Sequence, residues 1–262
     1  MKVAVVQSEP RFGLVRENLD AALETICSVD ADLFVFPELA LSGYLFESAD
    51  EARGLAQEPG APEFDAMEKA AREAASTVIV GFAERGGDGL YNSSMLLTAD
   101  GRREVYRKIH LFDSEKDIFL PGNAPAKVVE VGGIRLGMMI CFDWIFPELA
   151  RSLALDGADI LCHSANLVLP YCQDAMITRS IENRVFAATA NRVGTEARAG
   201  AELTFTGRSE IVAPDGEMLV RASEEMEEVL VAEIDPLAAR EKQVTPKNHI
   251  HEDRRPDLYH LD

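Results

Sequence analysis

Short apolar runs alternate with amphipathic segments over most of the chain. Residues 15–29 carry apolar side chains at helical spacing, and residues 146–157 have Pro147 near the start and Gly157 after the end. Both segments are predicted helices. Further helices are expected near residues 62–76 and from residue 175, and the second of these helices runs directly into another strand. Strands are expected over residues 2–8, 32–38, 77–83, 91–99, 103–108, 128–131, 134–141, 158–164 and 228–235.

Turn signals become more frequent in the second half of the chain. Asp100-Gly101 predicts a hairpin into the next strand, and Pro214-Asp215-Gly216 predicts another within residues 203–222. Helices and strands therefore alternate first and hairpins follow, without a linker or repeat. This order favours one mixed-sheet α/β domain over residues 1–262. Residues 246–262 form a polar tail that we expect to lie over the surface or over a partner subunit.

Composition narrows the possible partners. The chain has 262 residues with 45 acidic and 26 basic side chains, a net charge of −19, which argues against nucleic acid or an anionic membrane as a partner. We find no signal-peptide pattern and no apolar segment long enough to span a membrane. Four cysteines without a CxxC pair predict neither a disulfide framework nor a zinc site. A reduced cytoplasmic protein is the expectation.

Three ionisable residues follow predicted strands at their carboxyl ends. These are Glu38, Lys108 and Cys141, and such ends meet at one rim of an α/β sheet, where ligands bind. Together they make a covalent catalyst. Glu38 accepts the thiol proton as general base, and Lys108 stabilises the thiolate and then the oxyanion formed at a carbonyl or nitrile carbon. The backbone N–H of Phe142 is a candidate second oxyanion donor.

Two other kinds of site were considered. His110 or His163 with the cysteine would make a dyad of the papain type, but neither has a papain-like sequence context. His249, His251 and Glu252 suggest a metal site, but a convincing further ligand on a rigid element is missing. We therefore expect no metal and no organic cofactor.

Three segments in this order resemble the carbon–nitrogen hydrolases of the nitrilase superfamily. They are FPELALSGY around Glu38, YRKIHLF around Lys108 and MICFDWIFPELAR around Cys141. Three flanking segments resemble the small stand-alone bacterial and archaeal nitrilases and amidases. They are LALDGADI, SANLVLPYCQDAM and RSIENRVFAATANRVG. The resemblance implies a four-layer α-β-β-α sandwich with mixed sheets. It also implies a second glutamate after the lysine, Glu115, although this position could be an exposed loop glutamate instead.

The resemblance further implies a reaction without cofactor. Cys141 attacks a small, preferably aliphatic amide, ammonia leaves, and water releases the acid from a thioester; a nitrile passes through a thioimidate. Members usually form at least a homodimer, and residues 179–190 and the tail are the expected interface. Two other functions stay open, an N-carbamoyl amino acid or amine amidohydrolase and a non-catalytic ligand-binding protein on the same fold.

Further residues are candidates for the substrate pocket. Tyr44 follows a Ser-Gly pair, Trp144 lies just after the cysteine, and Asn166 follows another strand end, where it could bond a substrate amide. Each of them could equally be a packing residue. For a substrate carboxylate, Arg179 and Arg184 are available cations, although ion pairs with neighbours are their simpler role.

Overall fold

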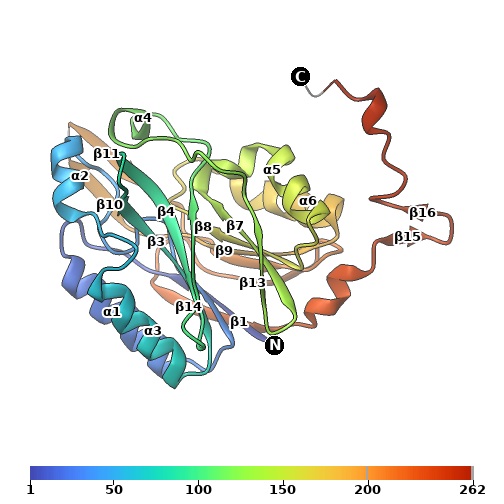
Figure 1. Cartoon of the computed structure of the whole chain (residues 1–262), viewed down its shortest axis with the longest axis horizontal. Helices are drawn as coiled ribbons and strands as arrows, with labels where there is room; N and C mark the ends of the chain where they lie inside the picture. The colour runs from blue at the N-terminus through green and yellow to red at the C-terminus, as the bar shows by residue number, and fades with distance from the viewer. Residues whose placement is uncertain (199, 261–262) are drawn as a thin grey trace.

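Two six-stranded sheets form the centre of the molecule in a computed structural model that describes residues 1–198 and 200–260 (Figure 1). The first sheet has the order β14-β1-β2-β3-β4-β5 and the second the order β13-β12-β9-β8-β7-β6. The bounds in the first sheet are β1 Lys2–Gln7, β2 Leu33–Val35, β3 Thr77–Arg85, β4 Leu90–Leu97, β5 Arg103–Arg107 and β14 Glu228–Glu233. Those in the second are β6 Val128–Val131, β7 Ile134–Ile140, β8 Ile160–Ser164, β9 Phe186–Ala190, β12 Glu210–Val212 and β13 Met218–Arg221.

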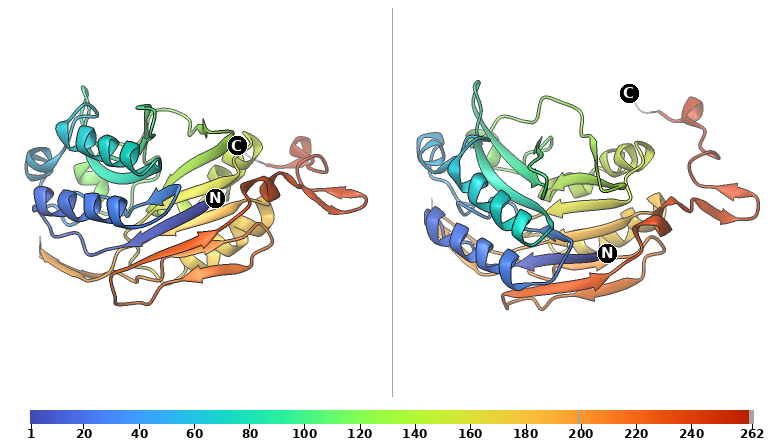
Figure 2. Two further views of the ribbon diagram at one scale, coloured as in Figure 1. Left: turned by 90° about the horizontal axis from the view of Figure 1, so that it is seen from below. Right: turned by 60° about the horizontal axis from the view of Figure 1, so that its bottom comes forward.

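Helices cover the outer face of each sheet, so that four layers stack (Figure 2). The helices α1 (Val15–Ser28) and α3 (Pro62–Glu73) pack on the first sheet, and α5 (Pro147–Leu155) and α6 (Cys172–Asn183) pack on the second. The expected α-β-β-α sandwich with mixed sheets is confirmed, since β1, β2 and β3 pair in parallel and the other strands of their sheet pair antiparallel.

The apolar runs in the sequence are continuous because both faces of the central strands are buried. In β1, Val3 and Val5 belong to the large core between the sheets, whereas Ala4 and Val6 belong to the core under α1 and α3. Successive strand residues point to opposite faces, so a four-layer protein needs apolar residues at every position of such a strand.

The structure contains two further elements that the sequence analysis does not predict, apart from residues 203 and 204. The helix α2 (Ala49–Leu55) begins after Ser48, whose hydroxyl accepts a hydrogen bond from the N–H of Glu51 at 3.2 Å. This Ser-x-x-Glu spacing is a helix-start signal that we overlooked. The hairpin of β10 (Thr195–Arg198) and β11 (Ala201–Thr204) has mostly exposed or half-buried side chains, and its sequence therefore lacks an apolar pattern.

The last part of the chain extends away from the sandwich as an arm (Figure 1). It contains the hairpin of β15 (Gln243–Thr245) and β16 (Asn248–His249) and leaves Val244 and Leu258 more than half exposed. Two hydrogen bonds hold the start of the arm against the sandwich. Lys242 Nζ donates them to the carbonyl oxygens of Asn183 and Arg184 at 2.9 and 2.7 Å. Among the described helices, none is long and apolar enough to cross a membrane.

Candidate active site

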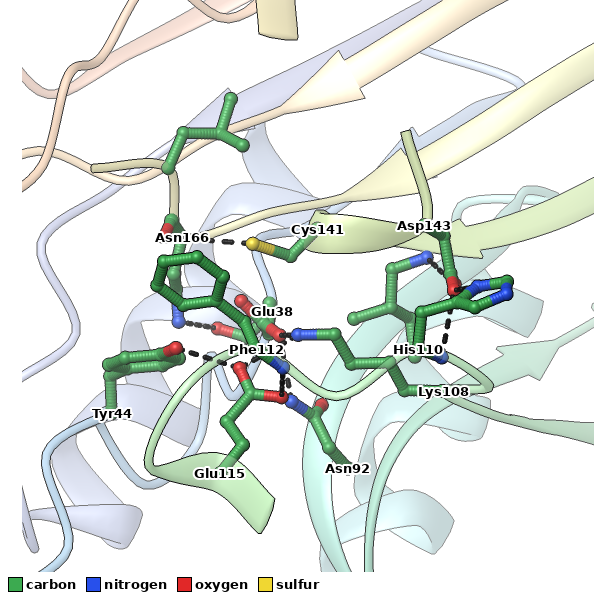
Figure 3. A network of polar contacts seen from close by, with 12 residues as sticks. Glu38, Tyr44, Asn92, Lys108, His110, Phe112, Glu115, Cys141, Asp143 and Asn166 are labelled. Atoms are coloured by element: carbon green, nitrogen blue, oxygen red, sulfur yellow. Dashed lines mark hydrogen bonds and ion pairs between the residues drawn. The ribbon is translucent and has the colours of Figure 1, made fainter. Parts of the chain in front are cut away.

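Glu38, Lys108 and Cys141 come together where the two sheets face each other (Figure 3). Glu38 follows β2 and Lys108 follows β5, and these strands run in the same direction within the first sheet. Cys141 follows β7 in the second sheet. The expectation that all three lie on the rim of one sheet is therefore wrong. The two sheets of a sandwich pack about 10 Å apart, so side chains at the strand ends of facing sheets can meet between them.

Lys108 lies between two carboxylates. Its Nζ is 2.6 Å from Oε1 of Glu38 and 2.7 Å from Oε1 of Glu115, and all three side chains are buried. Asn92 donates from Nδ2 to Glu38 Oε1 at 2.7 Å, and the hydroxyl of Tyr44 donates to Glu115 Oε1 at 2.7 Å. The lysine and the glutamates thus form one network of charge-assisted hydrogen bonds, and each such bond is stronger than a hydrogen bond between neutral groups.

Glu115 is buried rather than exposed in a loop. It begins the short helix α4 (Glu115–Ile118), and its side chain is 4 % exposed. Its Oε2 accepts a hydrogen bond from the N–H of Phe112 at 3.2 Å, which ties the segment after Lys108 back onto the network. The structure therefore places Glu115 beside Lys108, as the resemblance implied.

Cys141 has an unusual backbone conformation. Its φ is +40° at the start of the 3-10 turn η1 (Cys141–Ile145), and holding a non-glycine residue in the left-handed region costs about 1–3 kcal/mol. The thiol Sγ is 3.7 Å from the carbonyl oxygen of Asn166. The carbonyl of Cys141 is 2.9 Å from Nε2 of His163, so this imidazole holds the backbone and makes no bond to the thiol.

Neither histidine of the considered dyad contacts the sulfur within the described part of the chain. Burial lowers the pKa of His163 to about 4, which keeps the ring neutral. The Nδ1 atom of His110 is 2.7 Å from Oδ1 of Asp143. In Figure 3 the thiol lies above Glu38 and points toward the carbonyl oxygen of Asn166.

The buried surroundings shift the acid–base properties of the site. Burial and the charge of Glu38 raise the pKa of Cys141 well above its ordinary value, so the resting sulfur is a thiol. Burial also raises the pKa of Glu38 to about 7, although Lys108 opposes this. Burial disfavours the charged form of Lys108, but the carboxylates of Glu115 and Glu38 outweigh it and raise its pKa. A permanent cation therefore lies beside a carboxylate that titrates near neutrality.

Besides Oδ1 of Asn92, two buried oxygen atoms at the site have no hydrogen-bond partner among the described residues. Asn166 donates from Nδ2 to the carbonyl oxygen of Glu38 at 2.8 Å, which leaves its Oδ1 free. Oε2 of Glu38 is also free. Buried acceptors are nearly always paired in proteins, so these two oxygens are suited to N–H donors of a bound molecule.

Aromatic side chains close the site. The ring of Phe112 lies beside the sulfur in Figure 3, between Tyr44 and Asn166, and it packs against Phe142 with ring centroids 5.1 Å apart. Cys141 is only 5 % exposed. Trp144 is buried in the large apolar cluster that contains Cys141, and its carbonyl accepts a bond from Arg179 of α6.

Several partners in this network have no clear signal in the sequence. Asn92 was missed, although its position at the amino end of antiparallel β4 places it on the same edge as the ends of β2 and β5. Glu196 accepts bonds from the backbone N–H groups of Tyr44 and Leu45 at 3.1 and 2.7 Å, and pairs with buried Arg192 at 2.5 Å. Glu196 belongs to the hairpin that we did not predict, and nothing local identifies it.

The described residues contain no group of three or more histidine, cysteine or acidic side chains placed to hold a metal ion. In the tail, Nε2 of His249 is 4.0 Å from Oε1 of Glu252, and Nε2 of His251 has no hydrogen-bond partner among the described residues.

Comparison with known proteins supports the sequence resemblance. The sequence profile of the carbon–nitrogen hydrolase family matches residues 2–243. A nitrilase from Pyrococcus abyssi is 43 % identical over 99 % of each chain, and an (R)-stereoselective amidase from a Pseudomonas species is 36 % identical over 91 % of this chain and 87 % of its own. The crystal structure of a carbon–nitrogen hydrolase from Helicobacter pylori G27 superposes with a TM-score of 0.89 at 27 % identity, covering 99 % of this chain and 97 % of that one. The chain therefore belongs to the carbon–nitrogen hydrolase family.

Proposed function

We propose that this hydrolase cleaves small primary amides through a thioester on Cys141. Glu38 is the general base, Lys108 stabilises the oxyanion, and Glu115 orients Lys108 and assists proton transfer. The observation that carries the proposal is the position of Lys108 Nζ between the two glutamates, 2.6 and 2.7 Å away, in a buried site with the thiol.

The reaction follows from these positions. Sγ of Cys141 attacks the amide carbon while Glu38 accepts the thiol proton, and the carbonyl oxygen becomes an oxyanion beside Lys108. The N–H of Phe142 is proposed as a second donor to this oxygen. Glu38 then gives its proton to the nitrogen, the C–N bond breaks, and ammonia leaves a thioester. Water attacks the thioester after losing a proton to Glu38, and that proton returns to the sulfur as the acid departs.

The free acceptors favour an amide over a nitrile. Oε2 of Glu38 and Oδ1 of Asn166 need N–H donors, and an amide –NH2 group carries two, whereas a nitrile carries none. Leaving a buried acceptor unpaired costs about 1–3 kcal/mol. Small substrates are favoured because Cys141 is only 5 % exposed and the ring of Phe112 lies beside its sulfur.

An N-carbamoyl amino acid is a poorer candidate. Its carboxylate needs a free cation, but Arg179 pairs with Glu182 at 3.0 Å and donates to the carbonyl of Trp144. Arg184 caps the C-terminal end of α6 and donates to the carbonyl of Glu241.

Ammonia release from a matched panel tests the proposed substrate class. We expect acetamide, propionamide and butyramide to be hydrolysed, and the corresponding nitriles to react at least about tenfold more slowly, in line with one unpaired acceptor. Asn166→Ala should narrow this difference between amide and nitrile. Preferred turnover of nitriles or of N-carbamoyl amino acids would contradict the substrate class. Binding of amides without any turnover would favour the ligand-binding alternative.

The pH dependence reports the state of Glu38. Because the base must be ionised, kcat/KM should fall about tenfold per unit as the pH drops below the Glu38 pKa of about 7. Glu115→Gln removes a negative neighbour that raises this pKa, so it should move the acid limb to lower pH as well as lower kcat. Initial rates from about pH 5 to 9 check both expectations. An acid limb near the ordinary glutamate value in the native protein would contradict them.

We further propose that residues 1–262 work as one domain in a cytoplasmic homodimer or higher homo-oligomer. The outer side of α6 leaves Ile181 exposed, and the arm beyond residue 240 leaves Val244 and Leu258 exposed. Together these apolar side chains suit a second copy of the chain. Light scattering of the full chain and of a chain ending before residue 246 checks the role of the tail, and a monomeric full chain would contradict the proposal.

A further inference from the structure

One buried carboxylate connects the two sheets at the active site. Asp143 is fully buried and accepts bonds from four donor groups. Oδ2 accepts the hydroxyl of Tyr106 at 2.7 Å and the N–H of Ile140 at 2.9 Å. Oδ1 is 2.7 Å from Nδ1 of His110 and accepts the N–H of His110 at 3.2 Å (Figure 3). None of its partners is a lysine or an arginine, so the carboxylate is not half of an ordinary salt bridge.

The partners of Asp143 flank the proposed nucleophile and oxyanion residue. Ile140 immediately precedes Cys141 at the end of β7, whereas Tyr106 and His110 stand two residues before and after Lys108. β5 and β7 belong to different sheets. The carboxylate of Asp143 therefore ties the segment that carries the lysine directly to the turn that carries the cysteine.

We propose that Asp143 is a positioning residue, which holds Cys141 in its strained turn and in register with Lys108. The inference rests on the proposed function of these two residues. Cys141 has a φ of +40°, a conformation that its own side chain does not favour, so neighbouring bonds must maintain it. The bond to Ile140 fixes the residue before the nucleophile, and the bond from His163 Nε2 fixes the carbonyl after it.

We call the bonds of Asp143 to Ile140, Tyr106 and His110 the clamp, and stacked rings support its His110 side. The His110 ring stacks on Phe146 with centroids 3.7 Å apart, and Phe146 ends the turn that begins at Cys141. The hydroxyl of Tyr106 reaches Asp143 from a strand of the first sheet. A shift of Asp143 would thus move the lysine segment and the cysteine turn relative to each other, and a misplacement of about 1 Å can lower a rate by about 100-fold.

Asp143→Asn tests the clamp with little change of volume. All four partner groups donate to the carboxylate, and two of them are backbone N–H groups that cannot become acceptors. The –NH2 group of asparagine must therefore face a backbone donor on one side. We expect kcat per folded site to fall about 100-fold with KM for acetamide changed less than about threefold, and alkylation of Cys141 by iodoacetamide to slow as well.

A matched control exists at the other end of β7. Asp159 is a buried carboxylate that accepts the N–H of Arg135 at 2.9 Å and pairs with Arg240 at 2.8 Å. Asp159→Asn should lower the melting temperature without changing kcat or the alkylation rate per folded site. Tyr106→Phe removes one neutral donor from Asp143 and should lower kcat about tenfold, which keeps the test available if Asp143→Asn does not fold.

The outcomes separate this inference from the proposed function. Slower alkylation and lower kcat in Asp143→Asn and Tyr106→Phe, relative to Asp159→Asn, support the clamp. If both variants keep the kcat and the alkylation rate of Asp159→Asn per folded site, Asp143 has only a structural role and the inference is overturned. If the wild-type protein hydrolyses no amide, the proposed function fails, while the alkylation rates still decide the role of Asp143.

Discussion

Replacing Cys141 by alanine should abolish ammonia release from small amides, with kcat lowered on the order of 10⁴-fold or more. The thiol supplies the bond that holds the acyl group, and the buried site offers no second nucleophile at the same position. Loss of one member of a catalytic set removes most of the catalysis that the whole set provides. Initial rates with acetamide measure the effect, and mass spectrometry of the wild-type protein quenched during turnover should detect the acyl adduct.

Two buried cysteines provide matched controls. Cys162 and Cys172 are both fully buried in the same apolar cluster as Cys141. Cys162→Ala and Cys172→Ala create similar small cavities and should keep kcat within about threefold of the wild type, at some cost in stability. Substantial turnover by Cys141→Ala, or an acyl adduct on another residue, would refute the thioester mechanism.

Replacing Lys108 by methionine should impair both activity and folding. The ammonium lies between the carboxylates of Glu38 and Glu115, and none of the three side chains has significant contact with solvent. Removing it leaves uncompensated buried charge, which typically lowers the free energy of unfolding by about 3–5 kcal/mol. Loss of one oxyanion partner also lowers kcat by about 10²–10³-fold.

The pH dependence identifies the cause of this instability. The charge of Lys108 lowers the pKa of Glu38, so without this cation the pKa of Glu38 in the folded protein lies further above its unfolded value. The folded state then prefers a protonated Glu38, so the stability deficit should shrink as the pH falls. Denaturant unfolding at several pH values measures the deficit, and Lys108→Met with Glu115→Gln should recover stability but not activity. An unfolding free energy equal to that of the wild type would show that the network contributes nothing to the fold.

Most of the secondary structure can be predicted from the sequence, and so can the three catalytic candidates that follow predicted strands. Strands such as β1 and β7 and the helices α1 and α5 are recognisable because apolar spacing and terminal signals are local properties. Glu38, Lys108 and Cys141 were identified for the same reason, since each stands just after an apolar run. The hairpin of β10 and β11 was missed because few of its side chains are buried. The helix α2 was missed because its start is marked only by a short capping signal.

The assembly of the site cannot be predicted from the sequence, because it depends on contacts that form only in the tertiary structure. Glu38 and Lys108 are 70 residues apart, and Tyr44 bonds to Glu115 over 71 residues, so no local pattern records these contacts. The same holds for Glu115, whose charged neighbours in sequence resemble an exposed loop until the fold buries it beside Lys108. The positive φ of Cys141 and the four bonds of Asp143 arise only when two sheets pack face to face. Local periodicity specifies the elements, whereas the packing of the sheets sets the charges, distances and burial on which the chemistry depends.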